Sequence, residues 1–319
     1  MTQEEDSGIL GVSLVNDQLR IVEARQHEKE FHITHLSQGR VRQPFDFSFF
    51  EDRNNIPRLA EDIERLYETQ NFDVKNVAFS LDSQMVMVKK LPFDSTLVEE
   101  RIEEHINWEV RQFLISNVKE YVVDFERLKT GPSNGLEDML VVVVRKKIVK
   151  FLRQVFKHTN LNLKVVDVDV FSAQRTLQLN YDYEKDDTLA IVEVEENKIH
   201  FSLIKGKNLI LTQGGISPSP NGSVENEDST ARFIAKELRR LILDHQLGKT
   251  LEDLKEIFLY GEAVEDGILE SLQNNYDVHI DRTNPFRKVK LAISKQGEGF
   301  PERGERFTVS VGAALRGIQ

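Results

Sequence analysis

Gly11-Val12-Ser13-Leu14-Val15-Asn16-Asp17-Gln18-Leu19-Arg20-Ile21-Val22-Glu23-Ala24 is the stretch that sets the fold of this chain. Apolar runs at 9–15 and 19–24 flank a short polar turn, a pattern that predicts two strands joined as a hairpin. A third strand is expected at 30–35. The N-terminal part of the chain should therefore open with a three-stranded meander.

The same pattern returns in the second half of the chain. Residues 189–194 and 198–204 flank another polar turn, and 208–211 supplies a candidate third strand. Gly11 and Ala190 start the two copies, so the offset is 190 − 11 = 179 residues. A repeat of such a long period predicts two similar domains rather than a solenoid. The alternative is coincidence, because hairpins of unrelated α/β proteins also look alike.

Composition and charge limit the class of function. The 319 residues suffice for two domains, and the net charge of −11, without a concentrated basic face, opposes binding to nucleic acid or anionic lipid. The absence of cysteine excludes disulfides and thiolate metal sites. Residues 1–7 do not resemble a signal peptide, and no stretch approaches the ~20 apolar residues of a membrane span. We therefore expect a cytoplasmic protein that reaches a membrane only through a partner.

Hydrophobic periodicity predicts alternating helices and strands between and after the two meanders. Helices are expected at 56–67, 97–113, 146–160, 171–179, 233–245, 266–275 and 309–316. Further strands are expected at 77–81, 85–91, 120–129, 139–144, 164–168, 257–260 and 278–280.

Several local signals sharpen this pattern. Pro92 should end the strand at 85–91, and Thr96 with Glu99 forms a capping-box sequence before the next helix. The strand at 139–144 is apolar throughout, so we expect it to be central and covered on both faces. The glycines and prolines that begin at Gly214 predict a polar loop as far as about residue 229.

A few side chains are candidates for a site. Trp108, the only tryptophan, lies off the apolar stripe of its helix and is interpreted either as a half-buried rim residue or as an exposed partner anchor. His32 and His35 are three apart on a strand and should point to opposite faces, so surface positions are favoured over a metal site. Asp167 and Asp169 form either an acid pair or, as we favour, a turn cap.

The chain also carries a series of short motifs in a fixed order. These are Lys90-Leu91-Pro92, Ile106-Asn107-Trp108-Glu109, Val166-Asp167-Val168-Asp169, Leu259-Tyr260-Gly261, Asn284-Pro285-Phe286 and Gly312-Ala313-Ala314-Leu315-Arg316. Together they resemble the type IV pilus assembly protein PilM family, which belongs to the actin-like superfamily with FtsA and the sugar kinases. The resemblance implies an α/β actin-like fold of two duplicated RNase H-like domains, 1–182 and 183–319. The first would carry an inserted α/β subdomain at about 75–145, and the second a reduced insertion.

In actin-like ATPases the two meander turns bind phosphate and an aspartate on each organises Mg²⁺. The family pattern Asp-Ile-Gly-Ser-Ser of the first turn falls here on Ser13-Leu14-Val15-Asn16-Asp17. Ser13 and Val15 thus replace the aspartate and the glycine, and Asn16 and Asp17 replace the two serines. Asp17 places a negative charge where phosphate would lie.

The second turn departs from the family pattern in the same way. Its Asp-Ile-Gly equivalent is Glu193-Val194-Glu195, and the adenosine-contacting Gly-Gly pair becomes Gly261-Glu262. Glu195 would repel a phosphate and block the close approach that glycine permits. We therefore expect no nucleotide cofactor, no metal and no catalytic residues. The alternative is an active ATPase that binds ATP and Mg²⁺ and whose nucleotide state regulates assembly.

The resemblance then implies a function. We expect a non-catalytic cytoplasmic scaffold, a pseudo-ATPase of a type IV pilus or type II secretion assembly platform at the inner membrane. Its partner would be the cytoplasmic tail of a PilN-like membrane protein, held between residues 9–40 and 77–128. Self-association is possible, but an FtsA-like membrane-tethered filament would need an amphipathic C-terminal helix, and residues 315–319 end too early to supply one.

Overall fold

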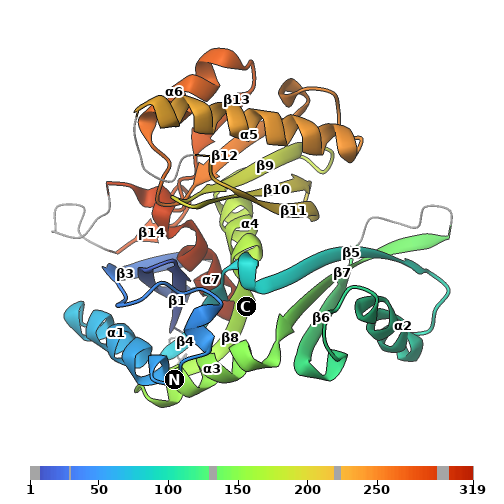
Figure 1. Cartoon of the computed structure of the whole chain (residues 1–319). Coiled ribbons are helices and arrows are strands. Elements are labelled where there is room, and N and C mark those ends of the chain that lie inside the picture. Colours follow the sequence, from blue (N-terminus) through green and yellow to red (C-terminus); the bar gives the residue numbers. More distant parts are fainter. Residues whose placement is uncertain (1–7, 29, 129–134, 219–223, 293–301, 319) are drawn as a thin grey trace. The chain divides into compact units, whose positions relative to one another are not determined.

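The computed structural model describes residues 8–28, 30–128, 135–218, 224–292 and 302–318 (Figure 1). The chain forms two compact units, the first comprising Met1–Asp169 with Ala313–Gln319 and the second Val170–Gly312. The division falls earlier than the expected boundary at residue 182, because the helix before that boundary lies with the second unit. The final residues return to the first.

The main sheet of the first unit begins with the predicted meander. Its strands are β1 (Gly8–Val15), β2 (Gln18–His27), β3 (Glu30–Arg40), β4 (Asn76–Leu81) and β8 (Asn162–Val168). They follow the order β3-β2-β1-β4-β8, antiparallel through the meander and parallel from β1 to β8. Helices α1 (Asn55–Thr69) and α3 (Lys146–Lys157) pack against this sheet and against each other.

The first unit has an aromatic core because β4, α3 and the segment after β3 bring phenylalanines to one place. The ring of Phe79 on β4 lies 6.0 Å from that of Phe156 on α3 and 6.1 Å from that of Phe45. Phe49 and Phe50 contact Phe151 edge to face at 5.7 and 5.2 Å. Such edge-to-face pairs add to the stabilisation from burial.

A small subdomain is inserted between β4 and α3. It contains β5 (Val86–Asp94), α2 (Glu99–Arg111), β6 (Tyr121–Arg127) and β7 (Leu136–Arg145). The three strands form an antiparallel sheet in the order β5-β7-β6, and α2 packs on one face of it. Residues 76–81, expected inside this insertion, instead form β4 of the main sheet.

The second unit repeats the strand order of the first. Its sheet contains β9 (Thr188–Val194), β10 (Lys198–Lys205), β11 (Asn208–Ile216), β12 (Glu256–Tyr260) and β13 (His279–Arg282). The order β11-β10-β9-β12-β13 matches β3-β2-β1-β4-β8 strand for strand, with the same antiparallel meander and the same parallel pairs. The predicted duplication is therefore confirmed.

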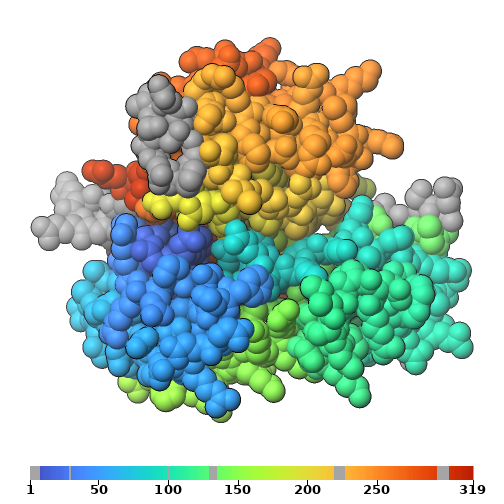
Figure 2. Space-filling view, viewed as in Figure 1, coloured from blue at the N-terminus to red at the C-terminus, as the bar shows by residue number. Residues whose placement is uncertain are grey.

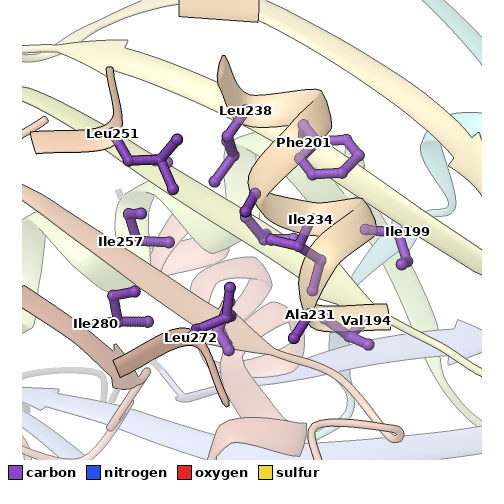
Figure 3. Close-up of a cluster of buried hydrophobic side chains, with 14 of the residues drawn as sticks. Val194, Ile199, Phe201, Ala231, Ile234, Leu238, Leu251, Ile257, Leu272 and Ile280 are labelled. Carbon is purple, nitrogen blue, oxygen red and sulfur yellow. The ribbon is translucent and has the colours of Figure 1, made fainter. Parts of the chain in front are cut away.

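Helices α5 (Val224–Asp244) and α6 (Asp266–Asn275) cover one face of the second sheet. In Figure 3, Ile199 and Phe201 of β10 meet Ile234 and Leu238 of α5, and all four are fully or almost fully buried. The burial of this face of β10 is thus explained by its packing under α5. The remaining elements are α4 (Asp169–Asn180), the short strand β14 (Lys290–Leu291) and α7 (Thr308–Ile318).

Four local expectations were wrong. β5 continues through Pro92 to Asp94, because β5 is an edge strand where a residue without an N–H group is tolerated. The capping box does not form: α2 begins at Glu99 without a side-chain cap. The Thr96 hydroxyl and N–H instead donate to the Asp94 carboxylate at 2.7 and 2.8 Å, which lowers its pKa.

The third wrong expectation is the loop from Gly214. Gly214 and Gly215 lie in β11, paired with His200 and Ile199 of β10. A Cβ on Gly215 would lie 3.3 Å from the ring of Phe233, so the glycine makes room for α5. Helix α5 begins at Val224, earlier than predicted. The remaining loop positions 219–223 fall outside the described residues.

The fourth wrong expectation concerns β7. It is central, as predicted, but only Met139, Val141 and Val143 are buried beneath α2. The alternate residues of the predicted strand, Leu140, Val142 and Val144, are only partly buried. The subdomain sheet is therefore closed on one face and partly open on the other.

Candidate functional site

The first candidate turn joins β1 to β2. Ser13 and Val15 are buried in the strand, and Asn16 adopts φ +51° at the tip. The carbonyls of Asn16 and Asp17 accept hydrogen bonds from the N–H groups of Phe45 and Val41, both at 2.8 Å. The turn backbone is thus tied to the segment after β3.

The Asp17 carboxylate lies at this turn, where the sequence predicted it. One of its oxygens accepts a hydrogen bond from Gln18 Nε2 at 2.7 Å, and the other lies 3.7 Å from Arg40 Nε. The turn therefore presents a carboxylate instead of a row of small residues with accessible N–H groups. Such a turn is a poor phosphate cradle.

The second candidate turn joins β9 to β10, and charged side chains of the turn contact one another. Glu193 and Lys198 are both almost completely buried, and Lys198 Nζ lies 2.9 Å from Glu193 Oε2. The Glu195 N–H donates to the Lys198 carbonyl at 2.9 Å. An ammonium group thus lies against Glu193, the residue that aligns with the family's metal-organising aspartate.

Glu195 makes the most informative contact of this turn. Its side chain is buried, and Oε1 accepts a hydrogen bond from the backbone N–H of Glu262 at 3.1 Å. Glu195 and Glu262 therefore lie in contact, although they are 67 residues apart in the sequence. An acidic side chain of the protein already binds the backbone donor that follows Gly261.

Gly261 allows this close approach. It adopts φ +117°, and a Cβ on it would lie 2.4 Å from the carbonyl oxygen of Val194 and 2.9 Å from Glu195 Oε1. Glycine is required here on both counts. Glu262 itself points toward Arg306, whose Nη1 lies 3.2 Å from Glu262 Oε1. The carboxylates on this side of the second unit are thus held by internal partners.

Asp167 and Asp169 do not form an acid pair on a strand. Asp167 lies in β8, whereas Asp169 begins α4 and is buried. The Asp169 carboxylate accepts hydrogen bonds from the N–H of Ser83 at 2.9 Å and from its hydroxyl at 3.2 Å. This contact fits the capping role that we favoured.

His32 and His35 lie on the same face of β3, contrary to the expectation. A β-bulge in the β2–β3 pair places His35 opposite Glu23 and His32 opposite Arg25, two positions that share a face of β2. His35 Nδ1 lies 3.5 Å from Glu23 Oε1. Even so, among the described residues no group of three or more His, Asp or Glu side chains could hold a metal ion.

Sequence reasoning missed the open face of the subdomain sheet. The strand register places Val88 of β5 and Val122 of β6 on the same face as Val142 and Val144 of β7, opposite α2. Val122 is 38% exposed, and the other three are partly buried. The signal in the sequence was the uninterrupted apolar run of β7, which is too apolar for a strand with a solvated face.

Trp108 is exposed, not half-buried at a rim: 56% of its surface is accessible. Its ring stacks loosely beside His105, with centroids 6.4 Å apart. Among the residues of the subdomain that the structure describes, the exposed large apolar ones are Val98, Trp108, Ile115, Val122, Phe125 and Leu136. Such a concentration on one small subdomain indicates interaction surfaces.

No helix in the described part of the chain combines the length and the apolar character needed to cross a membrane.

Comparison with known proteins agrees with the fold. The family model described as type IV pilus assembly protein PilM matches residues 11–214. A chain of a PilM–PilN type IV pilus biogenesis complex is similar to this chain with a TM-score of 0.79 at 18% identity, over 98% of both chains.

Two further solved structures have the same overall architecture. The cytoplasmic domain of EpsL, an inner membrane component of the type II secretion system of Vibrio cholerae, matches with a TM-score of 0.51 at 12% identity, over 97% of this chain and 95% of that one. A diol dehydratase-reactivating factor in nucleotide-free form matches with a TM-score of 0.53 at 7% identity, over 98% and 99%. At such low identity these likenesses show the fold, which is actin-like.

Proposed function

Because this chain belongs to the type IV pilus assembly protein PilM family, we propose that it is a non-catalytic actin-like scaffold of a type IV pilus or type II secretion assembly platform. Its partner is the cytoplasmic tail of a PilN-like membrane protein, and the likeness to a chain of a PilM–PilN complex supports this partner. The protein then lies in the cytoplasm and reaches the inner membrane through that partner.

The observation that carries the binding proposal is the open face of the subdomain sheet. Its apolar part is defined by Val88, Val122, Leu140, Val142 and Val144, and the strand register places three charged residues on the same face: Lys90, Asp124 and Glu126. Exposure of apolar surface to water is unfavourable, and an apolar segment that covers the surface lowers the free energy of the system. A membrane-protein tail that leaves the bilayer in an extended form is a suitable occupant. Of these residues, Val88 and Val122 lie within the region 77–128 that was expected to hold the tail, whereas those of β7 lie outside it.

Strand β6 is the better edge for such a tail. The other edge strand, β5, carries Lys89, Lys90 and Pro92, and lysines and proline discourage strand addition. β6 contains neither lysine nor proline. It exposes Val122 and Phe125, at 38% and 37%, together with three charged residues: Asp124, Glu126 and Arg127. We infer that the tail adds to β6 as a further strand, with its backbone groups hydrogen-bonded and its alternate side chains on the open face.

The internal contacts of the β1–β2 and β9–β10 turns support the non-catalytic part of the proposal. Asp17 in the first unit and Glu195 in the second each place a carboxylate at a turn where active relatives of the fold need N–H donors for phosphate. Glu193 is neutralised by Lys198 and does not need a metal ion. An incoming nucleotide would have to displace these internal contacts and overcome repulsion between like charges.

Thermal unfolding in the presence of Mg²⁺ and ATP tests this part. A nucleotide at ~100 times its dissociation constant would stabilise the fold by about 2.7 kcal/mol. We expect no change in Tm at millimolar MgATP, with MgCl₂ alone as the matched control. A shift that requires both ATP and Mg²⁺ would mean that the protein is an active member of the fold and that nucleotide controls partner binding.

A further inference from the structure

One stretch of the first unit concentrates positive charge. Residues 139–166 contain seven of the chain's 42 lysines and arginines and none of its 53 acidic residues. The rest of the chain therefore has a formal net charge of −11 − 7 = −18. Six of the seven cations lie at 145–157, in helix α3 and directly before it. The net charge of the whole chain conceals this local basic segment.

Four of these cations form one row along α3. They recur at intervals of four, three and four residues, which places them within about 60° of one another around the helix axis and spreads them over about 16 Å. We call this row the α3 stripe; its residues are Lys146, Lys150, Arg153 and Lys157, and all four are exposed. The buried residues of α3 lie on the opposite side of the helix: Ile148, Phe151, Leu152, Val155 and Phe156. The expectation that the chain lacks a concentrated basic face therefore does not hold for this helix.

The α3 stripe has no carboxylate partner in the described part of the chain. No acidic side chain there lies within ion-pair distance of its four cations, whereas Lys147 beside the stripe pairs with Glu51. On α5, by contrast, Arg240 lies 2.9 Å from both Glu237 and Asp244. Cations in a row without such partners repel one another, and an external anion relieves the repulsion.

The surroundings of the stripe indicate which kind of anionic surface it suits. None of the exposed large apolar side chains of the described residues lies at 145–164. Protein interfaces have an apolar and often aromatic centre, which this helix face does not offer. Spaced positive charges suit a layer of anionic phospholipid headgroups, because such a layer requires neither a pocket nor a partner of fixed geometry. In Figure 2 the yellow-green part of the chain that contains α3 reaches the surface at the lower edge of the view.

The position of α3 in the chain also favours a membrane. The helix begins at Lys146, directly after β7, the central strand of the sheet on which we place the tail. A protein held by the tail of a membrane protein lies close to phospholipid headgroups, and this step of the argument rests on the proposed function. We propose that the α3 stripe binds the anionic headgroups of the membrane surface without insertion. The tail and the stripe then act together, because a first contact raises the effective concentration for the second.

Flotation of the full chain with lipid vesicles, without any tail peptide, tests the proposal. At low salt the protein should bind vesicles that contain phosphatidylglycerol and phosphatidylcholine, and it should not bind vesicles of phosphatidylcholine alone. Each lysine or arginine near an anionic membrane strengthens binding about five-fold. Lys150→Glu combined with Arg153→Glu should therefore weaken binding to the mixed vesicles at least about 20-fold. High salt should weaken it in the same way, because it screens the charges.

The matched control is Lys236→Glu combined with Arg239→Glu on α5. These two cations are also exposed and three residues apart, so the change in net charge and in spacing is the same. This variant should bind the mixed vesicles within about three-fold of the wild-type protein. Circular dichroism and Tm should show that both double variants are folded.

Three results of this experiment would overturn the proposal. They are no binding of the wild-type protein to the mixed vesicles, equal losses in the two double variants, and tighter binding to duplex DNA than to the vesicles at the same salt. The vesicle assay contains no tail, and a titration with the tail peptide contains no lipid. A failure of the stripe is thus distinguishable from a failure of the tail proposal.

Discussion

Replacing Val142 with aspartate should abolish binding of the PilN-like tail. Val142 lies at the centre of the open face, between Val88 of β5 and Asp124 of β6 in the strand register. A second carboxylate there would lie directly beside that of Asp124 on the same face, and it would have to be dehydrated beneath the tail without a cationic partner. We expect at least a 30-fold weaker Kd in isothermal titration, equivalent to about 2 kcal/mol or more.

The matched control is Val98→Asp. Val98 is also an exposed valine of the subdomain, at 56%, but it lies at the start of α2. Its replacement should leave the tail affinity within about two-fold, and circular dichroism should show both variants folded. Equal losses in the two variants, or tail binding that survives in Val142→Asp, would show that the open face is not the docking surface.

Gly312→Val should cause the largest loss of stability of any single change considered. A Cβ on Gly312 would lie only 1.8 Å from the carbonyl oxygen of Ser172, so α7 crosses α4 too closely for any side chain. A hydrogen bond stabilises the crossing: the Thr176 hydroxyl donates to the Thr308 carbonyl at 2.7 Å. We expect a loss of at least about 3 kcal/mol in the free energy of unfolding, measured by urea denaturation.

Gly39→Ala is the comparison for that experiment. A Cβ on Gly39 would meet the Leu66 Cδ1 atom at 3.2 Å, and a leucine side chain can move by a few tenths of an ångström. Its cost should stay below about 1 kcal/mol. If Gly312→Val unfolded at the same urea concentration as Gly39→Ala, the close crossing of α4 and α7 would be wrong.

The sequence specified the architecture well because the duplicated meander is a local pattern. The runs around Asn16 and around Asn197 each predicted strands by alternation and a turn by polarity, and the pairing of β1 with β2 and of β9 with β10 follows from their adjacency. The strand order shared by the two units then confirmed the repeat. Signals that depend on neighbouring residues were thus sufficient for the fold.

Features that depend on distant residues were less predictable. The bulge brings His32 and His35 to one face because it interrupts the alternation of side chains between the two faces of the strand. The residue types at 32–35 do not predict this bulge. Pro92 was expected to end β5 because the sequence does not reveal which strand lies at an edge. The apolar run of β7 indicated that the strand is buried, but it did not reveal that one face of the strand would stay partly exposed.

In the candidate site, too, features of single positions were predictable from the sequence, whereas contacts between distant residues were not. The acidic residues Asp17 and Glu195, which stand where the family has a serine and a glycine, were visible by position, and they predicted a poor phosphate site. The hydrogen bond from Glu262 to Glu195 and the burial of the Glu193–Lys198 pair required the structure, because the contact between residues 195 and 262 spans 67 positions. The absence of a nucleotide remains a prediction, and so does the identity of the tail.

The most direct test of the central claim is an isothermal titration of the wild-type protein with a synthetic peptide of the PilN-like tail, performed with and without MgATP. A non-catalytic scaffold should bind the peptide with a Kd that agrees within about two-fold in the two conditions. Binding that appears only with MgATP would show that nucleotide controls the protein, and no binding in either condition would show that the tail is not its partner.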